Sequence, residues 1–216
     1  HMAETMRRHP PVSLPGLPRF TGGAVGYIGY DVVRSLERLP SPPPDDRGLP
    51  DAIIMVADTV LVLDNLFNRA TIIANVEAEP GVAREVLEAR YNAAIARIDD
   101  WLGRLSAPST LQALEISEAP PIPPTESPYP AEGYQAGVRK IQEYIAAGDT
   151  FQTVLSRRID VAAPEPFLAY RYLRALNPAP YLYFLHCDDL HVVGSSPEVL
   201  LRVEEGELTV RPIAGT

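Results

Sequence analysis

The chain has 216 residues, of which 46% are hydrophobic and 22% are charged, and its formal net charge is −9. This composition is sufficient for a folded core, and the length predicts one or two domains. An acidic balance argues against a nucleic-acid-binding protein, which needs a basic face. If the substrate is an anion, a metal ion or Arg and Lys side chains would have to neutralise it at the site.

The cysteine content and the hydropathy pattern predict a cytoplasmic protein without a membrane anchor. Cys187 is the single cysteine, so no disulfide can form within the chain, which fits a reducing compartment. It lies in an apolar run, which predicts a packed thiol rather than a reactive one. No targeting segment is visible, and residues 1–2 look like a vector-derived scar. The longest early apolar run, residues 52–57, is too short to cross a membrane.

The first part of the chain predicts a glycine-rich strand. Residues 1–19 are polar and Pro-rich without periodicity, and residues 20–30 form an apolar run that holds four glycines. Close strand packing explains these glycines, and a phosphate-binding loop is the alternative interpretation. Their spacing does not match the G-x-G-x-x-G pattern of a dinucleotide site. A short helix at 31–39, ended by Pro40, and a loop at 40–50 are expected to follow.

A strand hairpin and a long helix are predicted next. Residues 52–63 and 70–76 have strand character, and residues 64–68 supply the turn between them. The first of these strands is apolar on both faces, so it is expected to be central in a sheet. Apolar residues then recur at spacings of three and four through residues 81–102, which predicts a helix that stops at Gly103.

The second half of the chain alternates helices and strands after a Pro-rich linker at 106–130. A helix with Gly148 as its C-terminal cap is predicted at 131–147, a strand at 151–161 and a helix at 165–176. Four more strands are expected to follow: they cover residues 181–186, 190–194, 199–204 and 208–212, with a hairpin turn at Glu205-Gly206. This pattern predicts an α+β fold with largely antiparallel sheets and packed helices.

Two places in the second half are candidates for chemistry. The alternation of the strand predicted at 151–161 puts Gln152, Ser156 and Arg158 on one polar face, which meets either water or a ligand cleft. Glu198 follows a proline at the rim of an apolar sheet, where loss of water contact would favour a protonated carboxyl and so a general acid. An ordinary surface glutamate is the alternative. The four histidines show no metal-ligand spacing, and no P-loop, H-E-x-x-H or nucleophile-elbow motif is present.

Five segments in order resemble the chorismate-utilising enzymes, specifically the family of anthranilate synthase component I. They are residues 20–31 (FTGGAVGYIGYD), 148–156 (GDTFQTVLS), 176–181 (LNPAPY), 194–198 (GSSPE) and 211–216 (RPIAGT). Each motif alone is modest, but five in this order over nearly the whole chain are specific.

The resemblance implies the chorismate-binding fold of that family, of α+β class, and assigns four segments to it. Residues 1–19 are expected to be a disordered or tag-proximal segment, and residues 20–105 the remainder of the N-terminal sheet and helix region. Residues 106–130 are the linker, and residues 131–216 the first part of the catalytic domain.

The resemblance also implies a reaction in which ammonia adds to the chorismate ring, the ring hydroxyl leaves, and pyruvate is eliminated to give anthranilate. Glu198 matches the general acid that protonates the leaving hydroxyl, and Gly215 and Thr216 match the segment that contacts the substrate. Gln152 stands where isochorismate and salicylate synthases carry a Lys that activates water, so ammonia is the expected nucleophile. Ala214 is a further expected substrate contact. It stands where aminodeoxychorismate synthases carry a Lys that attacks the ring, so direct amination is expected.

A regulatory ligand, a cofactor and a partner follow from the same resemblance. Mg²⁺ is expected to bind the substrate carboxylate, and a glutamine amidotransferase is expected to supply ammonia. Part of a tryptophan feedback site is expected in residues 177–182, where Leu182 replaces a frequent Met and Ala179 a frequent Ser. Its expected contacts are Asn177, Pro178, Pro180, Tyr181 and Leu182.

The magnesium-binding glutamates and the catalytic His of the family match no residue of this chain. The chain is therefore expected to be a fragment that is inactive alone. An aminodeoxychorismate synthase component I and a non-catalytic module that binds a ligand or a partner are the alternatives. Exposed sheet edges and apolar patches would favour self-association.

Overall fold

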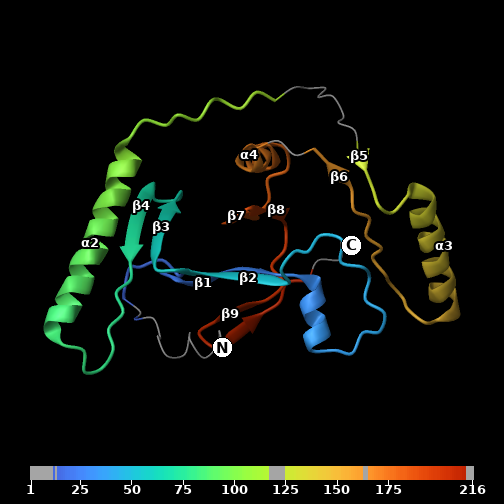
Figure 1. Ribbon diagram of the computed structural model, residues 1–216, viewed down its shortest axis with the longest axis horizontal. Helices are drawn as coiled ribbons and strands as arrows, with labels where there is room; N and C mark the ends of the chain where they lie inside the picture. Colours follow the sequence, from blue (N-terminus) through green and yellow to red (C-terminus); the bar gives the residue numbers. More distant parts are fainter. Residues whose placement is uncertain (1–11, 13, 117–124, 163–164, 213–216) are drawn as a thin grey trace. The chain divides into compact units, whose positions relative to one another are not determined.

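The computed structural model describes residues 12, 14–116, 125–162 and 165–212. The chain forms two compact units, His1–Leu111 and Gln112–Thr216. Their boundary falls within the Pro-rich segment (Figure 1). Helices alternate with antiparallel strand pairs in both, which confirms the α+β fold class.

The first unit is built from two antiparallel strand pairs. Strands β1 (Gly23–Ile28) and β2 (Ala52–Ala57) pair in the register Gly23↔Ala57, and β3 (Thr59–Asp64) and β4 (Arg69–Ala74) pair in the register Thr59↔Ala74. The predicted glycine-rich strand is thus confirmed as β1. The helix expected after it is shorter than predicted and is the 3₁₀ helix η1 (Tyr30–Ser35), in which the Arg34 guanidinium pairs with Asp31 at 2.6 Å.

The prediction of one central strand over residues 52–63 is wrong, because Asp58 divides it into β2 and β3 with different partners. The Asp58 carbonyl accepts hydrogen bonds from both the backbone N–H (2.7 Å) and the side-chain amide (3.1 Å) of Asn75. The same Asn75 amide donates to the Thr21 carbonyl at 2.6 Å. One side chain therefore joins the β3–β4 hairpin to the chain that leads into β1.

Helix α2 (Arg84–Ser106) packs along β4 (Figure 1). Arg97 on this helix donates to the Thr59 hydroxyl and to the Asn75 carbonyl, both at 3.1 Å. Ala94, three residues before it, is only 3% exposed, because its small side chain lets the helix approach closely. The expected stop at Gly103 is wrong: the helix runs three residues further. Arg104 and Asp100 form an i,i+4 ion pair at 2.9 Å across that last turn.

In the second unit, helix α3 (Ala131–Ala147) has the predicted bounds. It ends because Gly148 takes the left-handed conformation with φ 84° and donates to the Ile145 carbonyl, while the Asp149 N–H donates to Tyr144 at 2.9 Å. Helix α4 (Pro166–Leu176) also follows the prediction. The Glu165 carboxylate caps its start by accepting from the N–H groups of Phe167 and Leu168.

The strand predicted over residues 151–161 is mostly absent from the described structure. Only β6 (Asp160–Val161) pairs, with β5 (Thr125–Glu126). Residues 151–159 run outside any ladder, and Phe151 is 92% exposed. An alternating sequence becomes a strand only where a neighbour takes its N–H and C=O groups, and no other described strand does so here.

The second unit also holds two hairpins at the four predicted strands, of which the last two are shorter than predicted. Strands β7 (Tyr181–Cys187) and β8 (Leu190–Ser196) are joined by Asp188-Asp189. Strands β9 (Arg202–Glu204) and β10 (Glu207–Thr209) are joined by Glu205-Gly206, where both residues have positive φ as a type I′ turn requires.

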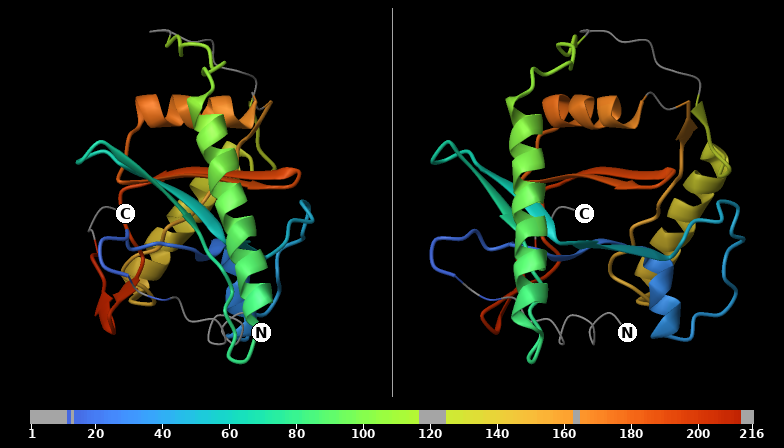
Figure 2. Two further views of the ribbon diagram at one scale, coloured as in Figure 1. Left: turned by 90° about the vertical axis from the view of Figure 1, so that its left-hand side faces the viewer. Right: turned by 60° about the vertical axis from the view of Figure 1, so that its left-hand side comes forward.

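Helix α4 lies along the β7–β8 hairpin (Figure 2). Three aromatic rings form this contact: the Phe184 ring on β7 lies 5.4 Å from Phe167 and 5.9 Å from Tyr170. Cys187, at the end of β7, is 8% exposed, so the expected packed thiol is confirmed.

The cap at Gly148 makes a prediction about stability. Replacing Gly148 with Ala should lower the free energy of unfolding by about 1 kcal/mol, because an L side chain is strained at positive φ. Gly103→Ala is the matched control of opposite sign: its added methyl meets open space within α2, and it should raise stability by about 0.5–1 kcal/mol. Far-UV circular dichroism during thermal unfolding measures both, and a stabilising Gly148→Ala would contradict the assignment of the cap.

Candidate functional site

The candidate general acid Glu198 lies just beyond β8, and residues 195–198, which include the last two residues of that strand, are called here the Glu198 loop. The Ser196 hydroxyl accepts a hydrogen bond from the Glu198 N–H at 3.2 Å and donates to the Glu198 carbonyl at 2.9 Å. Pro197, between Ser196 and Glu198, has its own backbone angle φ fixed by the proline ring. The backbone that carries Glu198 is therefore held rigidly, and the residue itself is half-buried.

The residues predicted to contact tryptophan lie next to this loop. The Ser195 hydroxyl donates to the carbonyl of Asn177, the last residue of the α4 cap, at 2.7 Å. The β7–β8 register pairs Leu182 with Ser195 and Tyr181 with Ser196. The structure thus brings the start of β7 and the Glu198 loop to the same end of one hairpin. Asn177, Pro178 and Pro180 are exposed there, whereas Tyr181 and Leu182 are half-buried.

Two further side chains belong to this end of the hairpin and were not predicted from the sequence. Arg202 on β9 donates to the Tyr181 hydroxyl at 3.4 Å, which links the second hairpin to the first. The ring of Tyr183 covers Gly194, its cross-strand partner, so closely that a Cβ on Gly194 would overlap the ring. The consecutive serines before Pro-Glu were the available signal for the loop contacts, since Ser hydroxyls often bond to nearby backbone in turns.

Gln152 lies outside this hairpin, on the segment between α3 and β6. It is exposed, and its backbone carbonyl accepts from the Thr150 hydroxyl at 3.0 Å. On the same segment Arg158 pairs with Asp160 at 3.2 Å, so part of the expected polar face serves a local ion pair. The remaining predicted substrate contacts, Ala214, Gly215 and Thr216, lie outside the described residues.

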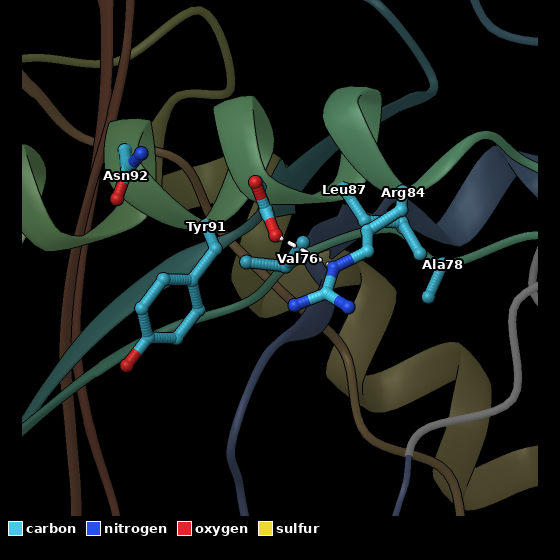
Figure 3. Close-up of a pocket in the computed structure, with 7 residues that line it drawn as sticks. Val76, Ala78, Arg84, Leu87, Tyr91 and Asn92 are labelled. Carbon is cyan, nitrogen blue, oxygen red and sulfur yellow. Dashed lines mark hydrogen bonds and ion pairs between the residues drawn. The ribbon is translucent and has the colours of Figure 1, made fainter.

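A shallow hollow of about 570 Å³ lies in the first unit between the end of β4 and the start of α2 (Figure 3). The Arg84 guanidinium, labelled in Figure 3, pairs with the Glu88 carboxylate at 2.8 Å. The Arg84 side chain is 87% exposed, so the hollow presents its cation to solvent rather than in a closed pocket. None of the predicted site residues lines it; its walls are Val76, Ala78, Arg84, Leu87, Glu88, Tyr91 and Asn92.

The described residues contain neither a cluster of three or more metal ligands nor a membrane-spanning helix. In the ranges that the structure describes, no group of three or more His, Cys, Asp or Glu side chains is placed to hold a metal ion. Within those ranges, none of the helices combines the length and apolarity that a membrane crossing requires.

Known proteins match the chain over its whole length. The family described as chorismate binding enzyme matches residues 1–216. The anthranilate synthase component 1 of Pseudomonas aeruginosa is 44% identical over 218 residues, which cover 99% of this chain and 43% of that protein. The protein of the same name from Pseudomonas putida is 44% identical over 214 residues, which cover 97% of this chain and 42% of that protein.

A solved structure agrees with these relatives. Anthranilate synthase component I from Streptococcus pneumoniae TIGR4 matches with a TM-score of 0.76 and 29% identity, over 94% of this chain and 44% of that chain. The chain therefore spans well under half the length of the proteins it matches.

The contact between Tyr183 and Gly194 predicts a strong coupling between these two positions. Gly194→Ala should destabilise the β7–β8 hairpin by about 1 kcal/mol, because the exposed Tyr183 ring has to move away from the new methyl. In a Tyr183→Ala background the same change should be nearly neutral, which gives a coupling energy of roughly 1 kcal/mol. Amide hydrogen exchange of the β7 and β8 residues measures all four proteins of the cycle, and additive effects would contradict the predicted overlap.

Proposed function

This chain belongs to the family of chorismate binding enzymes, and we propose that it forms part of an anthranilate synthase large component that converts chorismate and ammonia into anthranilate and pyruvate. The names and 44% identity of its curated relatives support this activity over others in the family. The observation that carries the proposal is the Glu198 loop, where one hydroxyl fixes both backbone groups of Glu198 at the end of a sheet strand.

In this proposal Glu198 is the general acid. Loss of the ring hydroxyl as water requires a proton, and a carboxylic acid held at a fixed position can deliver it as the C–O bond breaks. The rigid backbone of the loop favours this role, because proton transfer depends on distance and direction. Partial burial of the residue limits the water that would compete for the same proton.

Two other residues select the reaction. Gln152 carries a neutral amide, which cannot deprotonate water, so ammonia is the proposed nucleophile. Ala214 carries a methyl group, which cannot attack the ring to form a covalent intermediate, so direct amination is proposed. Gly215 and Thr216 would contact the substrate through backbone N–H groups and a hydroxyl.

Mg²⁺ is proposed as the cofactor of the whole protein, where it would neutralise the substrate carboxylate. The described residues do not fit this ion: they include no group of three or more carboxylates, imidazoles or thiolates placed around one point.

We also propose a partner and a regulator. The relatives are named as component 1, which supports a second component, and a glutamine amidotransferase would supply the ammonia. Tryptophan is the proposed inhibitor at residues 177–182, beside the Glu198 loop. The single thiol fits a cytoplasmic enzyme.

The proposed role of Glu198 is tested in the full-length protein that contains this chain. Glu198→Gln keeps the shape but removes the proton, and it should lower kcat for anthranilate formation by roughly 10²–10⁴-fold with little change in KM. Glu207→Gln, an exposed residue on β10, is the matched control and should leave kcat unchanged. An active Glu198→Gln variant would overturn the assignment, and aminodeoxychorismate as the product would favour the sister reaction.

A second prediction concerns the 216-residue chain alone, which matches about two fifths of its relatives. Mixed with chorismate, Mg²⁺ and ammonium, it should form no anthranilate by fluorescence, while the full-length protein in the same assay does. Turnover by the short chain would contradict the proposal that the site needs the rest of the relatives' length. Chorismate or tryptophan binding without turnover, measured by calorimetry, would show that the chain acts as a binding module.

A further inference from the structure

Two histidines face each other near the tip of the β7–β8 hairpin. The register pairs His186 with His191, next to the Cys187–Leu190 pair that closes the two-residue turn. In such a hairpin the closing pair exchanges backbone hydrogen bonds, so the next pair has no hydrogen bonds between its backbones and its side chains approach most closely. The two imidazole rings are 4.4 Å apart between centroids and nearly parallel, at 18°.

The surroundings leave this pair open to ligands from solvent. His186 is exposed and His191 is half-buried. The centroid of the Phe184 ring lies 5.6 Å from that of the His191 ring, so Phe184 forms an apolar wall on one side of the pair. Neither imidazole forms a hydrogen bond or an ion pair with another residue in the described part of the chain. Their nitrogen atoms are therefore available as acceptors or metal ligands.

From this geometry we propose that His186 and His191 form a two-ligand site for a divalent transition-metal ion of the Zn²⁺, Ni²⁺ or Cu²⁺ class. Neutral imidazole is a preferred ligand for these ions. With metal–nitrogen bonds of about 2.0–2.1 Å and ligand angles between square and tetrahedral, the ring centroids of two histidines on one ion lie roughly 4.5–5 Å apart. The observed 4.4 Å already matches this separation closely.

Binding the ion requires rotation of the rings but no change of register. The stacked rings present their faces to each other, and they must turn their edges toward a common point. That motion is a change of the last side-chain torsion of histidine, which has a broad energy minimum. Water completes the coordination, since the described residues offer no third His, Cys, Asp or Glu ligand at this point.

The local charge favours a cation. Asp188 and Asp189 form the turn beside the pair and are both exposed, and the whole chain carries a formal charge of −9. Their carboxylates raise the local concentration of divalent ions without being assigned as ligands. The site is separate from the Glu198 loop, at the opposite end of the hairpin, and does not depend on the proposed function.

Calorimetric titration of the 216-residue chain with Zn²⁺ at pH 7.5 tests the site. One ion should bind per chain, and His186→Asn and His191→Asn should each weaken binding at least tenfold. The double variant should lose little further affinity beyond either single variant, because each single change already removes the chelate. A His1→Asn, His9→Asn variant is the matched control, since these two residues near the N-terminus could bind metal by themselves, and it should leave the affinity of the hairpin site unchanged.

A second measurement guards against variants that fail to fold. In a His1→Asn, His9→Asn variant, which leaves the hairpin unchanged, substoichiometric Cu²⁺ should selectively broaden the imidazole proton signals of His186 and His191 in an NMR spectrum. Unbroadened signals of both residues would overturn the proposal. So would full Zn²⁺ affinity in a folded His191→Asn variant, which would show that the pair serves aromatic packing alone.

Discussion

The register of the β7–β8 hairpin is the constraint on which the second unit depends. A two-residue turn at Asp188-Asp189 sets which residues face each other along seven paired positions. Side chains alternate between the two faces of a strand, so a slip by one residue would move every one of them to the opposite face. The register places Phe184 under α4, the Tyr183 ring over Gly194, and Ser195 within reach of Asn177.

Elements with local end signals could be predicted almost to the residue. Helix α3 has a glycine at its C-terminal end and α4 has a carboxylate that caps its start, and both signals act within a few residues. The strands at 52–63 and 151–161 could not be predicted as well, because a strand needs a partner that is distant in sequence. Asp58 divides the first of them, and the second is paired only at Asp160–Val161.

The candidate site shows the same limit. Motifs in the sequence identified Glu198 and the neighbouring segment 177–182 as positions of interest, and both lie within the range that the family matches. The contacts that bring them together span 18 residues from Ser195 to Asn177 and 21 residues from Arg202 to Tyr181. No short-range pattern encodes such pairings, since they follow from the strand register and from the turn that precedes β9.

The Asn75 side chain has a consequence for the order in which the first unit folds. Its amide reaches the Thr21 carbonyl, 54 residues earlier in the chain, yet its backbone belongs to a hairpin whose strands are joined by a four-residue turn. Closing a short loop loses less entropy than closing a long one. We therefore expect the β3–β4 hairpin to form before β1 docks on it, with the Asn75 amide as the donor that then binds the Thr21 carbonyl.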